Sequence, residues 1–293
     1  PVAADASKVP VCVLIPAKNE AGNLPRCLAS VQWAAEIWVV DSQSTDGTAA
    51  IAEAQGARVV QFDFNGAWPK KKNWALATLP FGHPWVFILD ADEVMPPEAE
   101  AEFRGIVSGS ADRFAGYWIN RRFFFMGQWL RHAYYPNWNL RLFRHALGRY
   151  EKLTDLPTGS GDNEVHEHVI VNGPTARLRC EMDHYAFPTI SVFVEKHNRY
   201  SNWEAQVACA DGPNAGLQLG AVDRRRRLKR LARRLPFRAF LRFAYVYFWQ
   251  CGFLDGRAGY YFARLHGMYE SLSIMKAHEL RRAKVGLKRQ EEI

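Results

Sequence analysis

The sequence predicts an α/β fold that is built around a largely parallel β-sheet. Short apolar runs alternate with amphipathic stretches of helical length between Val9 and Asp92. Beyond Asp92 the pattern becomes irregular, and a basic, aromatic tail follows Arg224. The chain has 293 residues, of which 48% are hydrophobic and 23% charged, so its composition is that of a globular protein and excludes a disordered, collagen-like or coiled-coil chain.

Each predicted element follows from the length and periodicity of its residues. The first half contains predicted strands at Val11–Ile15, Ile37–Val40, Arg58–Phe62 and Trp85–Leu89, and predicted helices at Ala21–Val31, Asp46–Gln55 and Pro69–Leu79. Ser44-Thr-Asp46 is a candidate helix cap, and Gly56 is a candidate helix stop. The second half contains predicted helices at Pro96–Val107 and Thr189–Ala210 and strands of mixed direction at Arg113–Phe125, Asn139–Arg144, Val165–Val171 and Arg177–Glu181.

A breaker at Asp211-Gly-Pro213 indicates a domain boundary between residues 211 and 222. We therefore expect one domain over 9–215 and a C-terminal helical region over 222–293. The five cysteines are odd in number and form no C-x-x-C pair, which argues against a disulfide framework or a zinc ribbon and favours a reducing compartment. The first ten residues are small and polar and do not resemble a signal peptide.

Two loops at the predicted strand ends carry the candidate ligand-binding groups. Pro16-Ala-Lys18-Asn-Glu20 follows the first strand, and Asp41-Ser-Gln-Ser-Thr-Asp-Gly47 follows the second. In an open α/β sheet, ligands bind beyond the carboxyl ends of the strands, and a carboxylate there can accept hydrogen bonds from a base or a ribose. The structural alternative for Asp41 is a turn or helix-cap aspartate.

The fourth strand ends in Asp90-Ala91-Asp92-Glu93, which places three carboxylates within four residues. Unpaired acids at this spacing repel one another, and a divalent cation bound to a diphosphate would relieve that repulsion. The sequence therefore predicts a metal–diphosphate site at this turn.

These motifs make the sequence resemble the GT-A glycosyltransferases of family 2, in the subgroup of lipopolysaccharide-core glucosyltransferases. The matching stretches are Ile15–Glu20, Val39–Thr48, Leu89–Glu93, Arg141–Phe143 and Val165–Glu167. The resemblance implies a Rossmann-like GT-A domain with a mixed central sheet, a nucleotide-sugar donor, a Mg²⁺ or Mn²⁺ ion, and transfer with inversion. This sequence departs from the family at Asp41-Ser42, where Asp-Asp is common, and at Glu164-Val-His-Glu167, where the family has Glu-Asp. The Gln-x-x-Arg-Trp motif of processive synthases is absent.

The resemblance also implies roles for individual residues. It puts Asp41 on the uracil or an equivalent base, Asp90 near the ribose and Asp92 on the metal. By analogy with other GT-A enzymes, His184 supplies a nitrogen to the metal or a hydrogen bond to a phosphate, with a satisfied core histidine as the alternative. Zinc is not expected, because the spacing of His166, His168 and His184 fits no common zinc site.

Lysines and glutamates complete the predicted site. Lys70, Lys71 and Lys72 open the third helix, and we expect Lys70 or Lys72 to meet the diphosphate, because three adjacent lysines cannot all point into one cleft. The alternative is a solvated helix face. Inverting transfer needs a base that removes the proton of the acceptor hydroxyl, and Glu167 is the first candidate and Glu164 the second.

The tail carries the excess positive charge of the chain. Ten Lys or Arg residues and no acid lie between Arg224 and Arg242. Their charge of +10 exceeds the net charge of +8, so the remainder of the chain has a net charge of −2. Aromatic residues continue to Trp249, but the longest uncharged run is too short to span a bilayer. We expect residues 224–254 to lie on an anionic membrane surface, peripherally at the cytoplasmic side of the inner membrane, and the acceptor to be lipid-linked or a glycolipid. The alternatives are a helical bundle and an oligomer interface.

Three other functions remain to be weighed. A nucleic-acid-binding protein would leave Asp90-Ala91-Asp92-Glu93 without a role, and a sugar nucleotidyltransferase would need a Gly-rich, Arg-containing loop that Pro16–Gly22 lacks. We therefore expect no nucleic-acid partner. A polyprenyl-phosphate glycosyl synthase is the strongest alternative, because its anionic acceptor needs no base.

Overall fold

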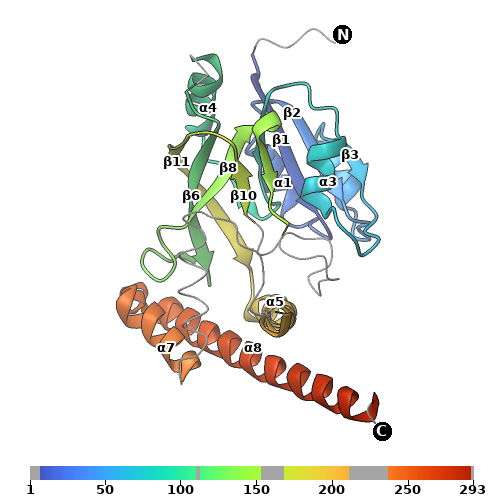
Figure 1. Ribbon diagram of the computed structural model, residues 1–293. Helices are drawn as coiled ribbons and strands as arrows, with labels where there is room; N and C mark the ends of the chain where they lie inside the picture. Colours follow the sequence, from blue (N-terminus) through green and yellow to red (C-terminus); the bar gives the residue numbers. More distant parts are fainter. Residues whose placement is uncertain (1–6, 110–112, 153–167, 211–236, 292–293) are drawn as a thin grey trace. The chain divides into compact units, whose positions relative to one another are not determined.

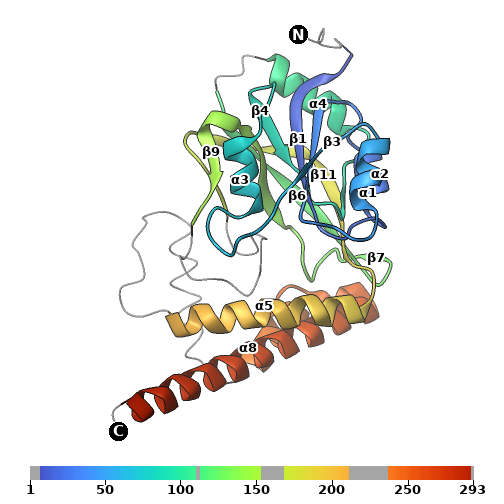
Figure 2. The ribbon, with the colours of Figure 1, turned by 90° about the vertical axis from the view of Figure 1, so that its right-hand side faces the viewer.

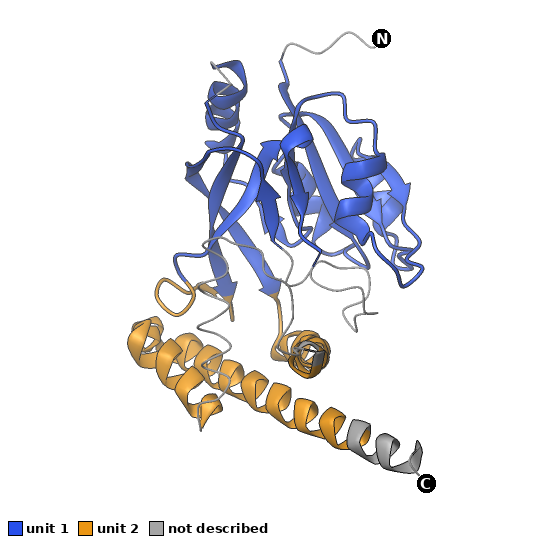
Figure 3. Cartoon of the chain, viewed as in Figure 1, with its two compact units in different colours: residues 1–124, 135–157, 161–186 blue, residues 125–134, 158–160, 187–293 orange. Residues whose placement is uncertain are grey.

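The computed structural model describes residues 7–109, 113–152, 168–210 and 237–291. The chain divides into two compact units (Figure 3). Unit 1 holds residues 1–124, 135–157 and 161–186, and unit 2 holds residues 125–134, 158–160 and 187–293. The helix at Ile190–Ala210, which the predicted boundary at 211–222 assigned to the first domain, groups with the C-terminal helices instead.

The first half of unit 1 alternates strands and helices as predicted (Figure 1). Its elements are β1 (Val9–Ala17), α1 (Leu24–Ala29), β2 (Ala34–Asp41), α2 (Thr48–Ala54), β3 (Arg58–Gln61), α3 (Lys71–Thr78) and β4 (Trp85–Ile88). Strand β1 pairs in parallel with both β2 and β4, and β2 pairs in parallel with β3. The carboxyl ends of β1, β2 and β4 therefore meet at one edge of the sheet, where the two candidate loops begin.

The second half of unit 1 extends the sheet with strands of mixed direction. It contains β5 (Glu93–Val94), α4 (Ala99–Ser108), β6 (Gly116–Phe125), β8 (Trp138–Arg144), a 3₁₀ turn (His145–Leu147), β9 (Gly148–Tyr150), β10 (Val169–Val171) and β11 (Thr175–Phe187). The short strand β7 (Gln128–Trp129) follows β6 in the chain and belongs to unit 2. The sheet order is β3-β2-β1-β4-β8-β6-β11-β5, with β7 beside β6, while β9 and β10 form a separate pair. Because β8 is antiparallel to both β4 and β6, the sheet is mixed, as predicted.

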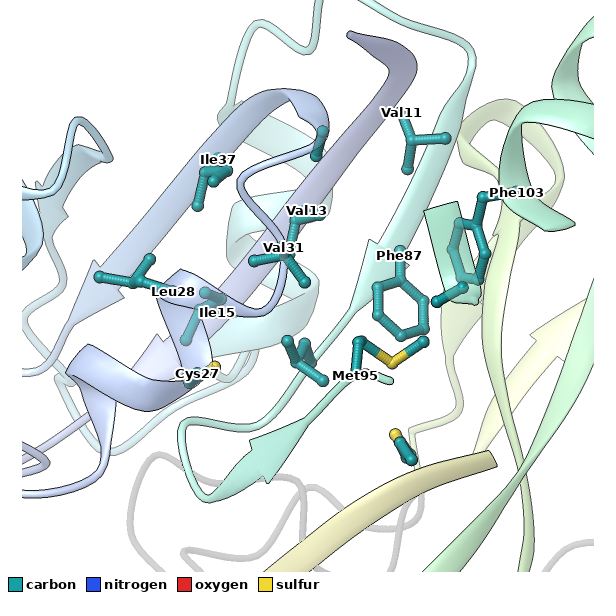
Figure 4. Close-up of a cluster of buried hydrophobic side chains, with 14 of the residues drawn as sticks. Val11, Val13, Ile15, Cys27, Leu28, Val31, Ile37, Phe87, Met95 and Phe103 are labelled. Carbon is teal, nitrogen blue, oxygen red and sulfur yellow. The ribbon is translucent and has the colours of Figure 1, made fainter. Parts of the chain in front are cut away.

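Alternating residues of β1 fill two hydrophobic clusters on opposite faces of the sheet. Val11 and Val13 pack on one face with Phe87 and Phe103 (Figure 4). On the other face Leu14 belongs to a cluster with residues of α3 and β9. This double burial explains why the early strands are continuous apolar runs.

Unit 2 is mainly helical. It contains α5 (Ile190–Ala210), α7 (Arg238–Ala244), a π-helical turn (Tyr245–Trp249), a 3₁₀ turn (Gly252–Asp255) and α8 (Gly256–Glu291). Helices α5 and α8 lie side by side (Figure 2), with Phe193 against Phe262 near one end and the Cys209 thiol donating to the Ala277 carbonyl further along. Among the described residues, no helix combines the length and the apolar character that crossing a bilayer requires.

Candidate functional site

The candidate site lies in unit 1, where β1 and β2 end beside each other. The last paired residues are Ala17 of β1 and Asp41 of β2. Asp41 is fully buried, and its carboxylate accepts hydrogen bonds from the Ser44 backbone N–H (3.1 Å), the Ser44 hydroxyl and the Gln61 side-chain amide (2.9 Å). Asp41 therefore organises the turn that follows β2, as the turn-aspartate alternative predicted. It also lies at the end of β2, where the sequence predicts a contact with the nucleotide base.

Side-chain hydrogen bonds tie the two loops after β1 and β2 together. The backbone N–H of Asn19 donates to Ser44 Oγ (2.8 Å), that of Glu20 to Thr48 Oγ1 (2.9 Å), and that of Ala21 to Asp46 Oδ2 (3.0 Å). The hydrogen bond from the Thr48 hydroxyl lowers the pKa of Asp46. Asp46 also accepts from the Thr48 backbone N–H at the start of α2, but the N-cap position is occupied by Gly47 in the left-handed region and not by the predicted Ser44-Thr-Asp46. The predicted Pro16, Lys18 and Glu20 are carried by this braced loop, with the Lys18 side chain exposed.

Asp90 and Glu93, at the end of β4, are neutralised by basic side chains. Asp90 Oδ1 lies 3.1 Å from Lys72 Nζ, and Asp90 Oδ2 lies 2.6 Å from Arg141 Nη2. Arg141 Nη2 also lies 2.9 Å from Glu93 Oε1, which Arg121 approaches to 3.2 Å. Burial alone would raise the pKa of Asp90, but Arg141 and Lys72 hold it well below its usual range. The expectation that a metal ion must relieve the repulsion among these acids is therefore wrong for Asp90 and Glu93.

Asp92 stands apart from that cluster and faces His184 on β11. Asp92 Oδ1 and His184 Nε2 are 3.5 Å apart, and each side chain is only 12% exposed. The pairing of β5 with β11 aligns His184 with Glu93, and the backbone N–H of Tyr185 donates to the Asp92 carbonyl oxygen (2.9 Å). The structure thus brings together the two residues that were predicted to ligate a metal.

These two side chains suit a Mg²⁺ or Mn²⁺ ion that is shared with a diphosphate. No group of three or more His, Cys, Asp or Glu residues suited to a metal occurs among the described residues. One carboxylate and one imidazole leave the remaining coordination positions to phosphate oxygens and water, which is how Mg²⁺ is commonly held in phosphate-transfer sites. Within the described chain, the donor set fits a metal that arrives with the nucleotide and does not form an all-protein cage.

The three lysines of α3 are buried, so the alternative of a solvated helix face is wrong. Their exposed fractions are 6% for Lys70, 1% for Lys71 and 8% for Lys72. Lys71 Nζ donates to the Ala17 carbonyl oxygen at the end of β1 (2.9 Å), whereas Lys72 reaches Asp90. Lys71 and Lys72 thus make different contacts, and Lys72 reaches the acidic turn.

The two candidate bases, Glu164 and Glu167, lie outside the described residues. The residues on either side of that segment are joined to each other, because Glu151 Oε1 accepts from the His168 backbone N–H (3.1 Å) and lies 3.0 Å from His168 Nδ1. Reciprocal hydrogen bonds between Asn73 and the backbone of Tyr150 attach β9 to α3. The described residues on either side of that segment therefore lie next to the helix that carries Lys72.

Sequence reasoning did not assign Arg121, and it gave no individual role to Glu93, one of the three adjacent acids. Arg141 entered only as part of a matching stretch and as a weak candidate. The Arg141 side chain is 6% exposed, and its Nη1 is buried without a hydrogen-bond partner. The one signal in the sequence for Arg141 was the match of Arg141-Leu-Phe143 to the family. A buried arginine within a strand requires acidic partners.

Comparison with known proteins identifies the family. The model of glycosyl transferase family 2 matches residues 12–163. The chain is 30% identical over 223 residues to the lipopolysaccharide core biosynthesis glycosyltransferase LpsC of Rhizobium meliloti, covering 70% of this chain and 74% of LpsC. It is 36% identical over 101 residues to the succinoglycan biosynthesis protein ExoU of the same organism, covering 31% of this chain and 29% of ExoU.

Solved structures with a similar chain path are more distant. The mannosyltransferase PcManGT from Pyrobaculum calidifontis, in complex with GDP-Man and Mn²⁺, is 16% identical with a TM-score of 0.45, covering 92% of this chain and 87% of that one. Glucosyl-3-phosphoglycerate synthase from Mycobacterium tuberculosis, in complex with Mn²⁺, UDP and glucosyl-3-phosphoglycerate, is 16% identical with a TM-score of 0.39, covering 71% and 82%. The family match and the LpsC relationship, together with the mixed sheet that carries both loops and the acidic turn, show that this chain is a GT-A glycosyltransferase and belongs to glycosyl transferase family 2.

Proposed function

We propose that the protein transfers a sugar, with inversion, from a nucleotide-sugar to a hydroxyl of a membrane-associated glycolipid or lipid-linked oligosaccharide. The observation that carries the proposal is the acidic turn after β4, where Lys72 and Arg141 hold Asp90 while Asp92 faces His184. Similarity to LpsC favours bacterial surface polysaccharide or lipopolysaccharide biosynthesis. UDP is the proposed nucleotide, on the resemblance to the lipopolysaccharide-core subgroup.

The donor's nucleoside end would meet the residues that the protein already holds in place. Asp41 is fixed by Ser44 and Gln61, and Asp90 by Lys72 and Arg141, so neither carboxylate has to reorganise when the donor binds. Preorganised polar groups of this kind reduce the free-energy cost of binding. We propose that Asp41 binds the nucleotide base of the donor and that Asp90 binds its ribose.

Asp92 and His184 would hold a Mg²⁺ or Mn²⁺ ion against the diphosphate. The ion supplies positive charge to the leaving diphosphate. Lys72, with its ammonium at Asp90, adds a second positive charge to the same turn. Within this proposal, Glu167 or Glu164 removes the proton of the acceptor hydroxyl on the face of the sugar opposite the diphosphate.

The acceptor is proposed to be presented at the cytoplasmic face of the inner membrane. The support is the basic, aromatic character of residues 224–254, which combines cations with large rings. A peripheral enzyme held there would meet a lipid-linked sugar without having to extract it from the bilayer.

A thermal-shift and hydrolysis panel tests the donor half of this proposal. UDP-, GDP- and dTDP-sugars are compared with Mn²⁺, with Mg²⁺ and with a chelator, on the wild type, on Asp92→Ala and on Glu53→Ala. Glu53 is an exposed acid on α2 and serves as the matched control. We expect one donor to stabilise the wild type and Glu53→Ala only with metal, and Asp92→Ala to lose that response. If no donor stabilises the wild type, the proposal is wrong.

A further inference from the structure

The segment Phe237–Leu254 of unit 2, here called the aromatic segment, exposes apolar side chains to solvent and directs its charged side chains inward. Every exposed residue in it is aromatic or leucine, whereas the solvent face of a soluble helix is normally polar. Phe237 and Trp249 are each 81% exposed. The exposed residues are Phe237, Phe240, Leu241, Tyr245, Phe248, Trp249, Phe253 and Leu254.

The two arginines of the aromatic segment point toward α8, not toward solvent. Arg238 forms an ion pair with Glu270, and Arg242 Nη2 lies 3.5 Å from His266 Nδ1. Close packing makes this possible: a Cβ at Gly267 would lie 3.0 Å from the Ala239 carbonyl oxygen, so a larger residue there would push α7 away from α8. The cations are thus engaged within unit 2, and the outward face is left to the rings.

The spacing and content of the outward face suit the interfacial layer of a bilayer. Exposed positions recur every three or four residues along α7 and into the π-helical turn, which gathers them on one side of the helix. Tyr245 and Trp249 combine an apolar ring with a polar tip, which is the chemistry favoured at the membrane–water boundary. Beyond the segment, Arg257 and Arg264 are exposed, and the one acid between residues 237 and 264, Asp255, is buried.

We propose that the aromatic segment inserts its rings into the interfacial layer of a lipid bilayer, and that apolar burial supplies most of the binding free energy of this contact. Each fully buried large apolar side chain contributes roughly 1.5–3 kcal/mol, whereas an exposed cation near anionic lipid contributes about 1 kcal/mol and is screened by salt. Arg238 is ion-paired with Glu270, and Arg242 is directed at the His266 ring of α8, so the rings and not these two cations face outward. The attachment by this segment therefore resists salt. This inference concerns unit 2 alone and does not depend on the transferase proposal.

Vesicle flotation of the full-length protein, without any donor or metal, tests the inference. The vesicles are pure phosphatidylcholine or contain about one third anionic phosphatidylglycerol, at about 0.1 M and about 0.5 M NaCl. We expect the wild type to float with both lipids. On pure phosphatidylcholine, which offers the basic residues 224–234 no anionic headgroup, it should lose less than about threefold of its partition coefficient at the higher salt. Phe240→Ser and Trp249→Ser should each lower the partition coefficient by about tenfold or more. Met275→Ser, on α8 outside the segment and 58% exposed, is the control and should leave it unchanged.

Two further measurements decide between this proposal and the alternatives. Far-UV circular dichroism must show unchanged helix content in each variant, and sedimentation velocity reports self-association. Binding only to anionic vesicles, abolished at the higher salt, would overturn insertion in favour of a purely electrostatic contact. A wild type that does not float but dimerises, with the dimer lost in Trp249→Ser, would overturn it in favour of a second copy of this chain.

Discussion

Arg141 Nη2 lies 2.6 Å from Asp90 Oδ2, and this contact joins the strand β8 to the acidic turn after β4. The same nitrogen lies 2.9 Å from Glu93 Oε1, so one guanidinium compensates two carboxylates that would otherwise repel each other. Burial disfavours the charge on Arg141, but Asp90 and Glu93 raise its pKa further above its already high value. Arg141 is therefore a positioning residue for Asp90.

Arg141→Lys should impair the donor site without unfolding the protein. A lysine keeps the charge but lacks the planar fork of the guanidinium, so it cannot hold both acids in the same geometry. We expect kcat/KM for the donor to fall by about tenfold or more, mainly through KM. Arg144→Lys, at the half-buried end of the same strand, is the comparison in steady-state kinetics. Equal kinetics for Arg141→Lys and the wild type would contradict the positioning role.

Removal of the metal should weaken binding of the diphosphate but not binding of the nucleoside. Asp41 and Asp90 are held by protein partners, whereas Asp92 faces His184 where the diphosphate would lie. We expect isothermal titration calorimetry to show UMP binding within about threefold with and without a chelator, and UDP binding weakened by about tenfold or more with the chelator. In Asp92→Asn, UDP should bind as it does to the chelated wild type. Equal metal dependence for UMP and UDP would contradict this division.

The strands and the acidic turn were predictable because their signals are local. The runs at Val11–Ile15 and Trp85–Leu89 are apolar without interruption, since both faces of these strands are buried. A carboxylate that directly follows such a run must lie at the carboxyl edge of the sheet. Asp41 and Asp90 could therefore be placed from the sequence.

The partners of these carboxylates were not predictable, because they depend on contacts between distant segments. Arg141 reaches Asp90 only because β8 inserts between β4 and β6. The inward orientation of Arg238 likewise depends on Glu270, which lies 32 residues later in the chain. No local pattern reports which acid such an arginine meets.

Substitution of the candidate bases should distinguish a hydroxyl acceptor from a phosphate acceptor. For a hydroxyl acceptor, either Glu164→Gln or Glu167→Gln should lower the transfer rate by about 10²-fold or more, because deprotonation then limits attack. The affinity for the donor should stay unchanged in both variants. If neither substitution lowers the rate, the acceptor is a polyprenyl phosphate, which is already anionic. Transfer assays with lipid-linked sugar and with polyprenyl phosphate provide the direct comparison.

Asp255→Asn should destabilise unit 2. The buried Asp255 carboxylate accepts the backbone N–H groups of Arg131 (3.0 Å), His132 (3.0 Å) and Ala133 (2.8 Å). An asparagine would direct an NH₂ group at donors and would remove the negative charge that they share. We expect a loss of about 2–4 kcal/mol in the free energy of unfolding, measured by urea denaturation. Glu279→Gln, an exposed acid on α8, should change it by less than about 0.5 kcal/mol.

Two buried histidines lie between α5 and α8 and are expected to make unit 2 sensitive to acid. The His197 ring stacks on Phe193 with centroids 3.7 Å apart, and its Nδ1 lies 2.9 Å from the Phe193 carbonyl oxygen. Burial lowers the pKa of His197 to about 4, with a further contribution from Lys196 on the same helix. Burial also lowers the pKa of His266, which faces Arg242 of α7. The other rings packed against this pair include those of Tyr134, Phe187, Tyr200, Phe262 and Tyr269.

Acidification should therefore destabilise the α5–α8 pair below about pH 6.5. Between about pH 6.5 and pH 4 the unfolded chain binds a proton at His197 that the folded chain does not, so stability falls as pH falls. For His197 the expected loss between pH 7 and pH 4 is about 3 kcal/mol, and His266 acts in the same direction. His197→Phe keeps a ring against Phe193 and removes the titrating group, so its unfolding free energy should depend less steeply on pH. His278→Phe, at an exposed position of α8, is the control, and identical pH slopes for His197→Phe and the wild type would contradict this account.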